Sequence, residues 1–290
     1  MRHLLSIADL SLGDVHVVLD TASAIGEHKR WYPLNGRTVA NLFYEDSTRT
    51  RISFELASKN LGADVMNFST EGSSVSKGEG LKDTALTLQA LGANAFVVRH
   101  ASSGAPQAIS NWVDGPVVNA GDGTHEHPTQ ALLDLYTMRE HFGGLAGLRV
   151  GIVGDIRHSR VAHSLQLALA KMGAEFVLIG PRKLVSSRPG PYVSYDLERE
   201  LPTLDVCYML RAQKERHASE YDLGDFSLTE ERAAMLPTDS IVMHPGPMNR
   251  GSEIASLVAD SPRSRILDQV TNGVLIRSAV LWLMLDTPLK

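Results

Sequence analysis

The feature that most constrains the fold of this chain is a regular alternation of short apolar runs with longer amphipathic stretches. The short runs are rich in valine, isoleucine and leucine, which favours buried strands. Strands that alternate with helices are typical of βαβ units and parallel sheets. The expected strands cover residues 38–43, 64–68, 95–99, 116–119, 149–153, 175–179, 206–210 and 240–244. The expected helices cover residues 48–61, 81–91, 128–142, 161–172, 228–236 and 270–285.

The strands fall into two sets, which predicts an α/β protein with two doubly wound parallel-sheet domains joined by interdomain helices. A chain of 290 residues suits two domains of about 130–150 residues each better than a single small core. Glycines at 143, 144 and 147 follow the helix expected over 128–142, and glycine commonly ends helices. We therefore expect a first domain over 1–142, completed by a C-terminal helix over 270–290, and a second domain over 143–269.

Composition argues against several classes of protein. The formal net charge of -5 at pH 7 does not favour a nucleic-acid-binding protein. The apolar run at 279–285 is too short to span a bilayer, and the first residues lack the apolar core of a signal peptide. The single cysteine, Cys207, permits no internal disulfide and fits a reducing compartment. We expect a soluble cytoplasmic protein with no nucleic-acid partner and no membrane partner.

A segment rich in hydroxyl groups and arginines follows the first expected strand. It reads Ser47-Thr48-Arg49-Thr50-Arg51 and opens the next expected helix. Hydroxyl residues cap helix starts, and the free N–H groups there attract anions together with the helix dipole. The planar guanidinium group of arginine matches phosphate oxygens. The segment thus indicates a phosphate site, with a capped helix and two solvated arginines as the alternative. Because there is no glycine-rich Walker loop, a nucleoside triphosphate is not favoured.

Five segments, in this order along the chain, resemble motifs of the aspartate and ornithine carbamoyltransferases. They are Ser47-Thr48-Arg49-Thr50-Arg51, Val98-Arg99-His100, His127-Pro128-Thr129-Gln130, Arg211-Ala212-Gln213-Lys214-Glu215-Arg216 and His244-Pro245-Gly246-Pro247. The resemblance spans nearly the whole chain. It implies an enzyme that transfers the carbamoyl group of carbamoyl phosphate to the amine of an amino acid, with no metal and no organic cofactor.

The resemblance also implies which residues bind carbamoyl phosphate. Those that contact its phosphate are Ser47, Thr48, Arg49, Thr50 and Arg99. Thr50, Arg99 and His127 are catalytic, since they stabilise the oxyanion that forms when an amine attacks the carbonyl carbon. Gln130, one helical turn after His127, accepts from the carbamoyl NH2 group. The backbone carbonyls of Pro245 and Gly246 bind the same NH2 group.

The second half of the chain carries cations that suit a dicarboxylate acceptor, because arginine binds carboxylates bidentately. The resemblance assigns the α-carboxylate to Arg160 and the side-chain carboxylate to Arg211 and Gln213. Ornithine enzymes of the family carry an acidic residue in place of this Arg-x-Gln pattern and a cysteine where Gly246 stands here. We therefore expect L-aspartate as the acceptor, in the committed step of de novo pyrimidine biosynthesis. Ornithine or another amino acid is the alternative, and Val161 stands where some members have threonine.

A polar loop over residues 72–79 bears on assembly. By resemblance, Ser74 and Lys77 of this loop reach into the active site of a neighbouring subunit, where Lys77 contacts aspartate. From the residues alone, a surface loop that touches no substrate is the alternative. The resemblance thus implies a homotrimer with shared active sites. It leaves open whether regulatory chains or a dihydroorotase bind the trimer.

Three other interpretations compete with this one. A metal site at His125-Glu126-His127 lacks the HExxH spacing and a nearby cysteine. A dinucleotide site at the strand that ends in Gly151-Ile152-Val153-Gly154 lacks the full GxGxxG fingerprint and its acidic ribose ligand. A scaffold protein without catalytic activity would need none of the polar residues described above.

Overall fold

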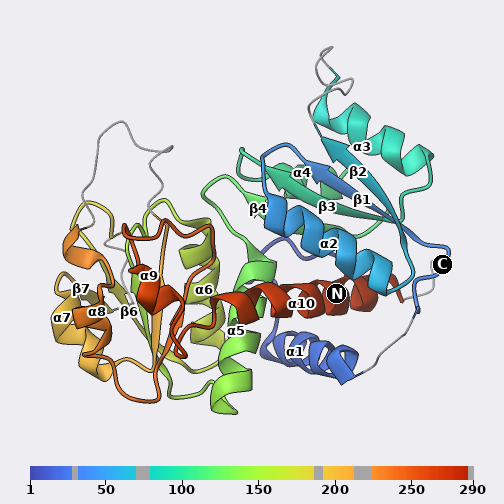
Figure 1. Cartoon of the computed structure of the whole chain (residues 1–290). Helices are drawn as coiled ribbons and strands as arrows, with labels where there is room; N and C mark the ends of the chain where they lie inside the picture. The colour runs from blue at the N-terminus through green and yellow to red at the C-terminus, as the bar shows by residue number, and fades with distance from the viewer. Residues whose placement is uncertain (28–31, 70–78, 186–191, 212–223, 287–290) are drawn as a thin grey trace. The chain divides into compact units, whose positions relative to one another are not determined.

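A computed structural model describes residues 1–27, 32–69, 79–185, 192–211 and 224–286, which form two compact units (Figure 1). The first unit comprises Met1–Leu133 and Thr271–Lys290, and the second comprises Asp134–Val270. The chain passes between the units inside helices α5 (Pro128–Phe142) and α10 (Ile266–Leu285). The division between the first and second units falls within α5.

The first unit contains a four-stranded parallel sheet with the strand order β2-β1-β3-β4. Its strands are β1 (Thr38–Phe43), β2 (Asp64–Ser69), β3 (Ala95–His100) and β4 (Val117–Asp122). Its helices, besides its parts of α5 and α10, are α1 (Leu12–Glu27), α2 (Thr48–Asn60), α3 (Leu81–Ala90) and α4 (Ala105–Ser110).

Alternate residues of the adjacent strands β1 and β3 build the core on one face of this sheet, as the two-residue period of a strand requires. Leu42 and Phe96 are fully buried and belong to a cluster that includes Ala85 of α3 and Ile109 of α4. Helices α3 and α4 therefore cover this face.

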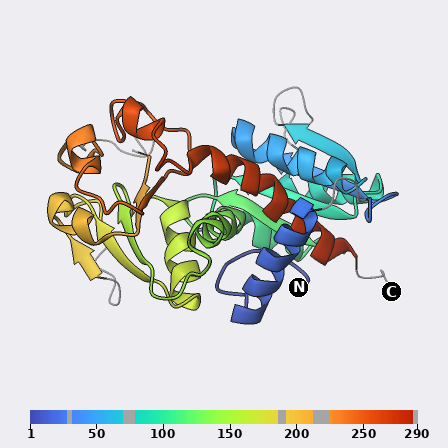
Figure 2. The ribbon, with the colours of Figure 1, turned by 60° about the horizontal axis from the view of Figure 1, so that its bottom comes forward.

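A buried arginine ties α10 to α2, although the two helices are far apart in the sequence. Nη1 of Arg277 donates a 2.8 Å hydrogen bond to Oγ of Ser53, and its guanidinium carbon lies 5.2 Å from the ring centre of Phe54. Figure 2 shows α10 beside α1, where a Cβ atom at Gly26 would lie 3.5 Å from Cδ1 of Leu275. The last part of the chain thus packs within the first unit.

The second unit contains a five-stranded parallel sheet with the order β7-β6-β5-β8-β9. Its strands are β5 (Arg149–Val153), β6 (Glu175–Ile179), β7 (Tyr192–Ser194), β8 (Val206–Met209) and β9 (Ile241–Met243). Its shorter elements include α6 (Arg160–Lys171), α7 (Leu197–Glu200), α8 (Glu230–Ala233) and α9 (Ser256–Ala259), with 3-10 turns at Leu201–Thr203 and Gly224–Phe226.

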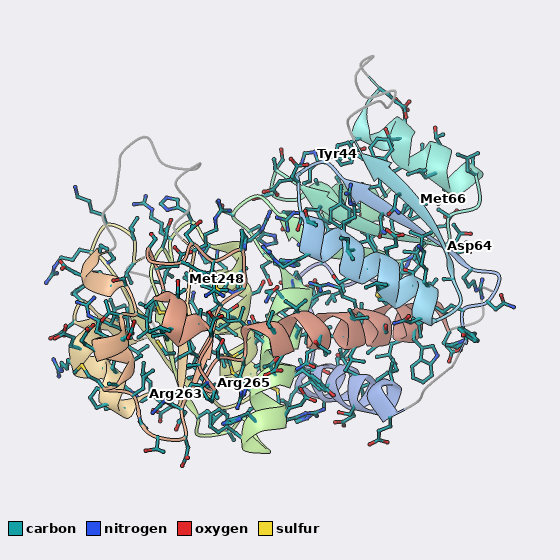
Figure 3. All side chains as sticks on the ribbon, in the orientation of Figure 1. Tyr44, Asp64, Met66, Met248, Arg263 and Arg265 are labelled. Atoms are coloured by element: carbon teal, nitrogen blue, oxygen red, sulfur yellow. The ribbon has the colours of Figure 1, made fainter. Side chains whose placement is uncertain are left out.

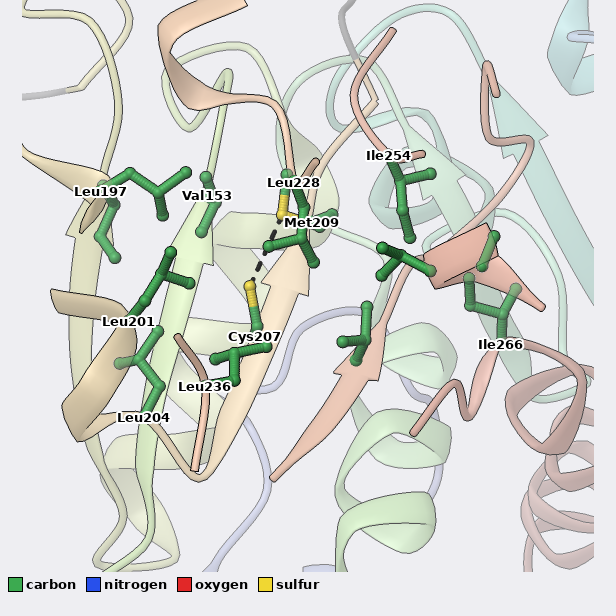
Figure 4. Close-up of a cluster of buried hydrophobic side chains, with 14 of the residues drawn as sticks. Val153, Leu197, Leu201, Leu204, Cys207, Met209, Leu228, Leu236, Ile254 and Ile266 are labelled. Atoms are coloured by element: carbon green, nitrogen blue, oxygen red, sulfur yellow. Dashed lines mark hydrogen bonds between the residues drawn. The ribbon is translucent and has the colours of Figure 1, made fainter. Parts of the chain in front are cut away.

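Figure 4 shows the core of the second unit, where side chains from the strands meet Leu228 and Ile266. Cys207 lies inside this core, and its thiol is 3.7 Å from Sδ of Met209. Burial raises the pKa of the Cys207 thiol to about 12, so it stays protonated at neutral pH. Cys207 therefore acts as a small apolar side chain and not as a nucleophile.

The predicted fold class is confirmed, since both sheets are parallel and each predicted strand is present. The helix expected over 228–236 is limited to α8, and the elements missing from the prediction are α1, α4, α7, α9 and β7. None of the described helices is long and apolar enough to cross a bilayer.

Candidate active site

The first sheet has a topological switch point between β1 and β3. The chain goes from β1 to β2 on one side, and then to β3 and β4 on the other. Ligands of open α/β sheets bind beyond the carboxyl ends of the strands at such a point. Tyr44 (labelled in Figure 3) follows β1, and its N–H donates a 2.9 Å hydrogen bond to the carbonyl of Arg99 in β3. The segments that leave β1 and β3 therefore start side by side.

The predicted phosphate-binding segment leads from this switch point into α2. Ser47 is the N-cap residue, has an extended backbone and makes no side-chain capping bond. Thr48 and Arg49 are exposed, whereas Thr50 is buried. A hydroxyl group that does not cap its own helix can bind an anion together with the N–H groups of the first turn. The local geometry thus suits a phosphate group.

Arg99 is held at the carboxyl end of β3 by two oxygens. Its side chain is 12% exposed, with Nε 3.7 Å from Oε2 of Glu45. Its Nη1 donates a 3.2 Å hydrogen bond to the carbonyl of Ala120 in β4. Charges act over longer distances in a partly buried environment than in water. A cation fixed in this way can stabilise negative charge that develops on a ligand at the switch point.

Two buried carboxylates brace the loop between β4 and α5. Asp122 accepts a 2.7 Å hydrogen bond from the N–H of Gly104, and Glu126 accepts one of 3.0 Å from the N–H of Ile7. The exposed His125 pairs with Asp122, with 3.1 Å between Nδ1 and Oδ2. The part of the chain that the structure describes contains no cluster of three or more side chains arranged to hold a metal ion.

This braced loop presents His127 and Gln130 at the start of α5. Their side chains are buried, at 4% and 7% exposed. The N–H of Gln130 donates a 3.0 Å hydrogen bond to the carbonyl of His127, and Pro128 occupies a position where helices tolerate proline. Residues one turn apart share a helix face. The first unit thus contains both residues, together with Thr50 and Arg99, beyond the carboxyl ends of its strands.

The second sheet has its own switch point, between β5 and β8. Gly154 follows β5 with φ +121, a conformation that favours glycine, and the N–H of Leu210 donates a 2.8 Å bond to the carbonyl of Val153. Arg211 comes next after Leu210. The loops that carry Arg160 and Arg211 therefore leave neighbouring strands at the point where a ligand is expected.

The loop before α6 is ordered by its own polar groups. Oδ1 of the buried Asp155 lies 2.9 Å from Nδ1 of His158, and Oγ of Ser159 caps α6 by accepting a 3.2 Å bond from the N–H of Ala162. Arg160 is the first residue of the helix and is 6% exposed. A buried cation at the N-terminus of a helix is repelled by the positive end of the helix dipole. A bound carboxylate would offset this repulsion.

The remaining predicted residues divide into two groups. Pro245 and Gly246 follow β9, are partly buried, and precede Pro247 with a cis Gly246–Pro247 bond. Ser74, Lys77 and Gln213 lie outside the described residues. Sequence reasoning missed Glu45 and Glu253, the carboxylates that face Arg99 and His244. The sequence around a single acidic residue in a loop does not indicate which residue it will contact in the fold.

Two family models match the chain and together cover most of it. Residues 2–140 match the family described as "Aspartate/ornithine carbamoyltransferase, carbamoyl-P binding domain". Residues 146–284 match the family described as "Aspartate/ornithine carbamoyltransferase, Asp/Orn binding domain".

Relatives and solved structures agree with these matches. The chain is 58% identical over 303 residues to the aspartate carbamoyltransferase catalytic subunit of Salinispora tropica, covering 98% of each. The subunit of the same name from Thermobifida fusca is 58% identical over 300 residues, covering 98% of this chain and 96% of that protein. Aspartate transcarbamoylase from Trypanosoma cruzi, solved with aspartate and phosphate, has a TM-score of 0.90 and 32% identity, covering 98% of this chain and 95% of that one. Ornithine carbamoyltransferase from Gloeobacter violaceus has a TM-score of 0.86 and 28% identity, covering 98% and 99%.

Proposed function

Because this chain belongs to the aspartate/ornithine carbamoyltransferase family, we propose that it transfers the carbamoyl group of carbamoyl phosphate to the amine of L-aspartate. The products are N-carbamoyl-L-aspartate and phosphate, and the reaction is the committed step of de novo pyrimidine biosynthesis. One observation carries the choice of acceptor. The chain is 58% identical, over 98% of both chains, to a relative named for aspartate.

In this proposal, the amine nitrogen attacks the carbonyl carbon and forms a tetrahedral intermediate. Thr50, Arg99 and His127 donate hydrogen bonds to its oxyanion. The bond from carbon to the phosphate oxygen then breaks, and the departing phosphate takes the electron pair and accepts the amine proton. The residues that hold the phosphate are Ser47, Thr48, Arg49, Thr50 and Arg99. No residue forms a covalent bond with the substrate, so positioning and electrostatics supply the acceleration.

The remaining roles concern the carbamoyl NH2 group and the acceptor. Gln130 and the carbonyls of Pro245 and Gly246 accept hydrogen bonds from the NH2 group. The proposed aspartate-binding residues are Arg160, Arg211, Gln213 and Lys77. The burial of Arg160 at a helix start supports its role, because a carboxylate there gains from both the guanidinium group and the helix dipole.

A product assay tests the acceptor. Purified protein mixed with carbamoyl phosphate and L-aspartate is expected to form carbamoyl aspartate, measured colorimetrically or by mass spectrometry. L-Ornithine in place of aspartate is expected to give less than about 1% of that rate, because its cationic side chain meets arginines. Citrulline as the main product would contradict the proposal. So would the absence of product with both amino acids.

We further propose that the protein is a cytoplasmic homotrimer in which Ser74 and Lys77 complete the active site of a neighbouring subunit. An apolar stripe on α2 supports association, since Ile52 and Leu56 lie one turn apart and are 47% and 45% exposed. The buried thiol of Cys207 suits a reducing compartment. The curated relatives are named as catalytic subunits, which fits association with regulatory chains or a dihydroorotase.

Two inactive variants test whether the sites are shared. His127→Ala and Lys77→Ala should each abolish most activity as pure trimers. After the two are mixed, dissociated and reassembled, random hybrids should recover up to about one quarter of wild-type activity, because each subunit contributes to a site in its neighbour. Hybrid trimers verified by native mass spectrometry that stay inactive would show that Lys77 acts only within its own subunit.

A further inference from the structure

The loop after β9 offers hydrogen-bond acceptors but no available backbone donor between residues 245 and 247. Pro245 and Pro247 have no N–H group. The N–H of Gly246 is used within the loop, where it donates a 2.9 Å hydrogen bond to Nδ1 of His244. No described residue donates a hydrogen bond to the carbonyl oxygen of Pro245 or Gly246. The loop therefore suits a ligand group that only donates.

A series of buried hydrogen bonds fixes the position of His244, which is 1% exposed. Its backbone N–H donates a 3.0 Å bond to Oε1 of Gln269, whose Nε2 donates a 2.7 Å bond to Oδ1 of Asp134. The other carboxylate oxygen of Asp134 accepts a 2.7 Å bond from the hydroxyl of Tyr208. The bonds run from α5 and β8 through α10 to the loop, all within the second unit.

The ring of His244 is fixed from its other side by Glu253. Nε2 lies 3.4 Å from Oε1 of Glu253, which also accepts a 2.9 Å bond from the N–H of Asn249. Burial acts to raise the pKa of Glu253, but hydrogen bonds from His244 and Asn249 outweigh it and hold the pKa below its ordinary value. Met248 (labelled in Figure 3) packs against the hydrophobic core and anchors the loop beyond its prolines.

These contacts define the protonation pattern of the imidazole. A ring nitrogen that accepts a hydrogen bond from an N–H group must carry a lone pair, so Nδ1 is unprotonated. The ring proton of the neutral form is therefore on Nε2, where it faces the Glu253 carboxylate. Only this tautomer holds the Gly246 N–H group and leaves the loop without a free donor.

We propose that His244 is a positioning residue that determines specificity for a carbamoyl donor over an acyl donor without an NH2 group. His244 acts by accepting the hydrogen bond of the Gly246 N–H group. Without this acceptor, the N–H group would lie unpaired beside the two carbonyls and would repel the N–H groups of the ligand. This inference rests on the proposed function, in which the carbonyls of Pro245 and Gly246 bind the carbamoyl NH2 group. Acetyl phosphate is the matched probe, because a methyl group replaces the NH2 group and makes no such bond.

Two variants of His244 separate this role from general support of the fold. His244→Leu removes the acceptor, whereas His244→Asn keeps one, because asparagine side chains readily bond the N–H group two residues on. In His244→Leu, the KM for carbamoyl phosphate should rise by about 10–100-fold, as expected for two impaired hydrogen bonds. The Ki of acetyl phosphate as a competitive inhibitor should change by less than about threefold. His244→Asn should restore most of the discrimination between the two donors.

Each other outcome counts against the inference. Parallel changes of both constants would mean that His244 only supports the fold, and unchanged constants would mean that the Gly246 N–H group has no effect. If His244→Leu does not fold, NMR of wild-type protein labelled with 15N-histidine decides, with the His244→Asn spectrum giving the assignment. Protonated Nδ1 would overturn the inference. Absence of carbamoyl aspartate from the wild type would instead defeat the proposed function, and the NMR result would still test the loop.

Discussion

Arg99→Ala is expected to lower kcat for carbamoyl aspartate formation by about 10³-fold, the upper end of the loss for one oxyanion-stabilising donor. Arg99 is 12% exposed and held by Glu45 and the carbonyl of Ala120, so its guanidinium group is fixed at the end of β3 before a ligand binds. Its loss also leaves the Glu45 carboxylate near the proposed phosphate site, where like charges repel. Steady-state kinetics with both substrates varied measure the effect.

The matched control for this variant is Arg37→Ala. Arg37 immediately precedes β1, so it lies at the amino end of the same sheet, away from the switch point. The net charge changes by the same amount, yet kcat should stay within about twofold of wild type, because a half-buried charge at the opposite end of the sheet contributes little at the switch point. Equal losses in the two variants would show that overall charge matters and would remove Arg99 from the proposed mechanism. Thermal unfolding of both variants checks that they fold.

Arg160→Ala is expected to raise the KM for aspartate by about 10²–10³-fold, the scale of losing a charged partner for a buried carboxylate. Because Arg160 is buried at the start of α6, its guanidinium group is held in one orientation, whereas a water-exposed arginine side chain can adopt many. Since the proposed donor site does not include Arg160, the KM for carbamoyl phosphate should stay within about threefold. Initial rates over a wide range of aspartate concentrations provide the measurement.

Arg157→Ala serves as the control, because Arg157 is an exposed arginine in the same loop. Its backbone N–H bonds the carbonyl of Leu184, a contact that alanine keeps. The KM for aspartate should change by less than about twofold. A normal KM in Arg160→Ala, or a rise as large in Arg157→Ala, would reject the assignment of the α-carboxylate to Arg160.

The strands were predictable from the sequence because a strand buried inside a sheet is apolar along its whole length. β1, β5 and β6 have the predicted bounds, and each is flanked by a strand on both sides. The strand β7 escaped prediction because it has only three residues at the sheet edge, where Tyr192 is exposed. β9 is equally short and lies at the opposite edge, but its three residues are all apolar and buried, so it left an apolar run that β7 lacks.

Helix α1 carried a signal that was overlooked. The N–H of Asp14 donates to Oγ of Ser11, and the N–H of Ser11 donates to the Asp14 carboxylate, which is the reciprocal arrangement of a capping box. Ser-x-x-Asp before an apolar stretch was therefore visible in the sequence. The helix expected over 228–236 is shortened to α8, because Leu228 and Leu236 pack into the core from outside the helix, Leu228 through a β-bridge to Ile254.

The candidate site was predictable where a residue follows a strand, and obscure where its support is distant. Arg99 and Arg211 stand at strand ends, and parallel strands end along one edge of a sheet. In contrast, Asp134 and Gln269 are hydrogen-bonded across a sequence separation of 135 residues. No local period or motif encodes such a contact, so only the folded chain reveals that α5 and α10 support the loop at His244.

Because Cys207 is buried, the wild-type chain should not react with thiol-directed dyes. With the lone native thiol protonated and enclosed, maleimide dyes should attach only to cysteines introduced at exposed positions. One such cysteine in each compact unit would carry one dye of a donor–acceptor pair, and energy transfer would report the distance between the units with and without each substrate.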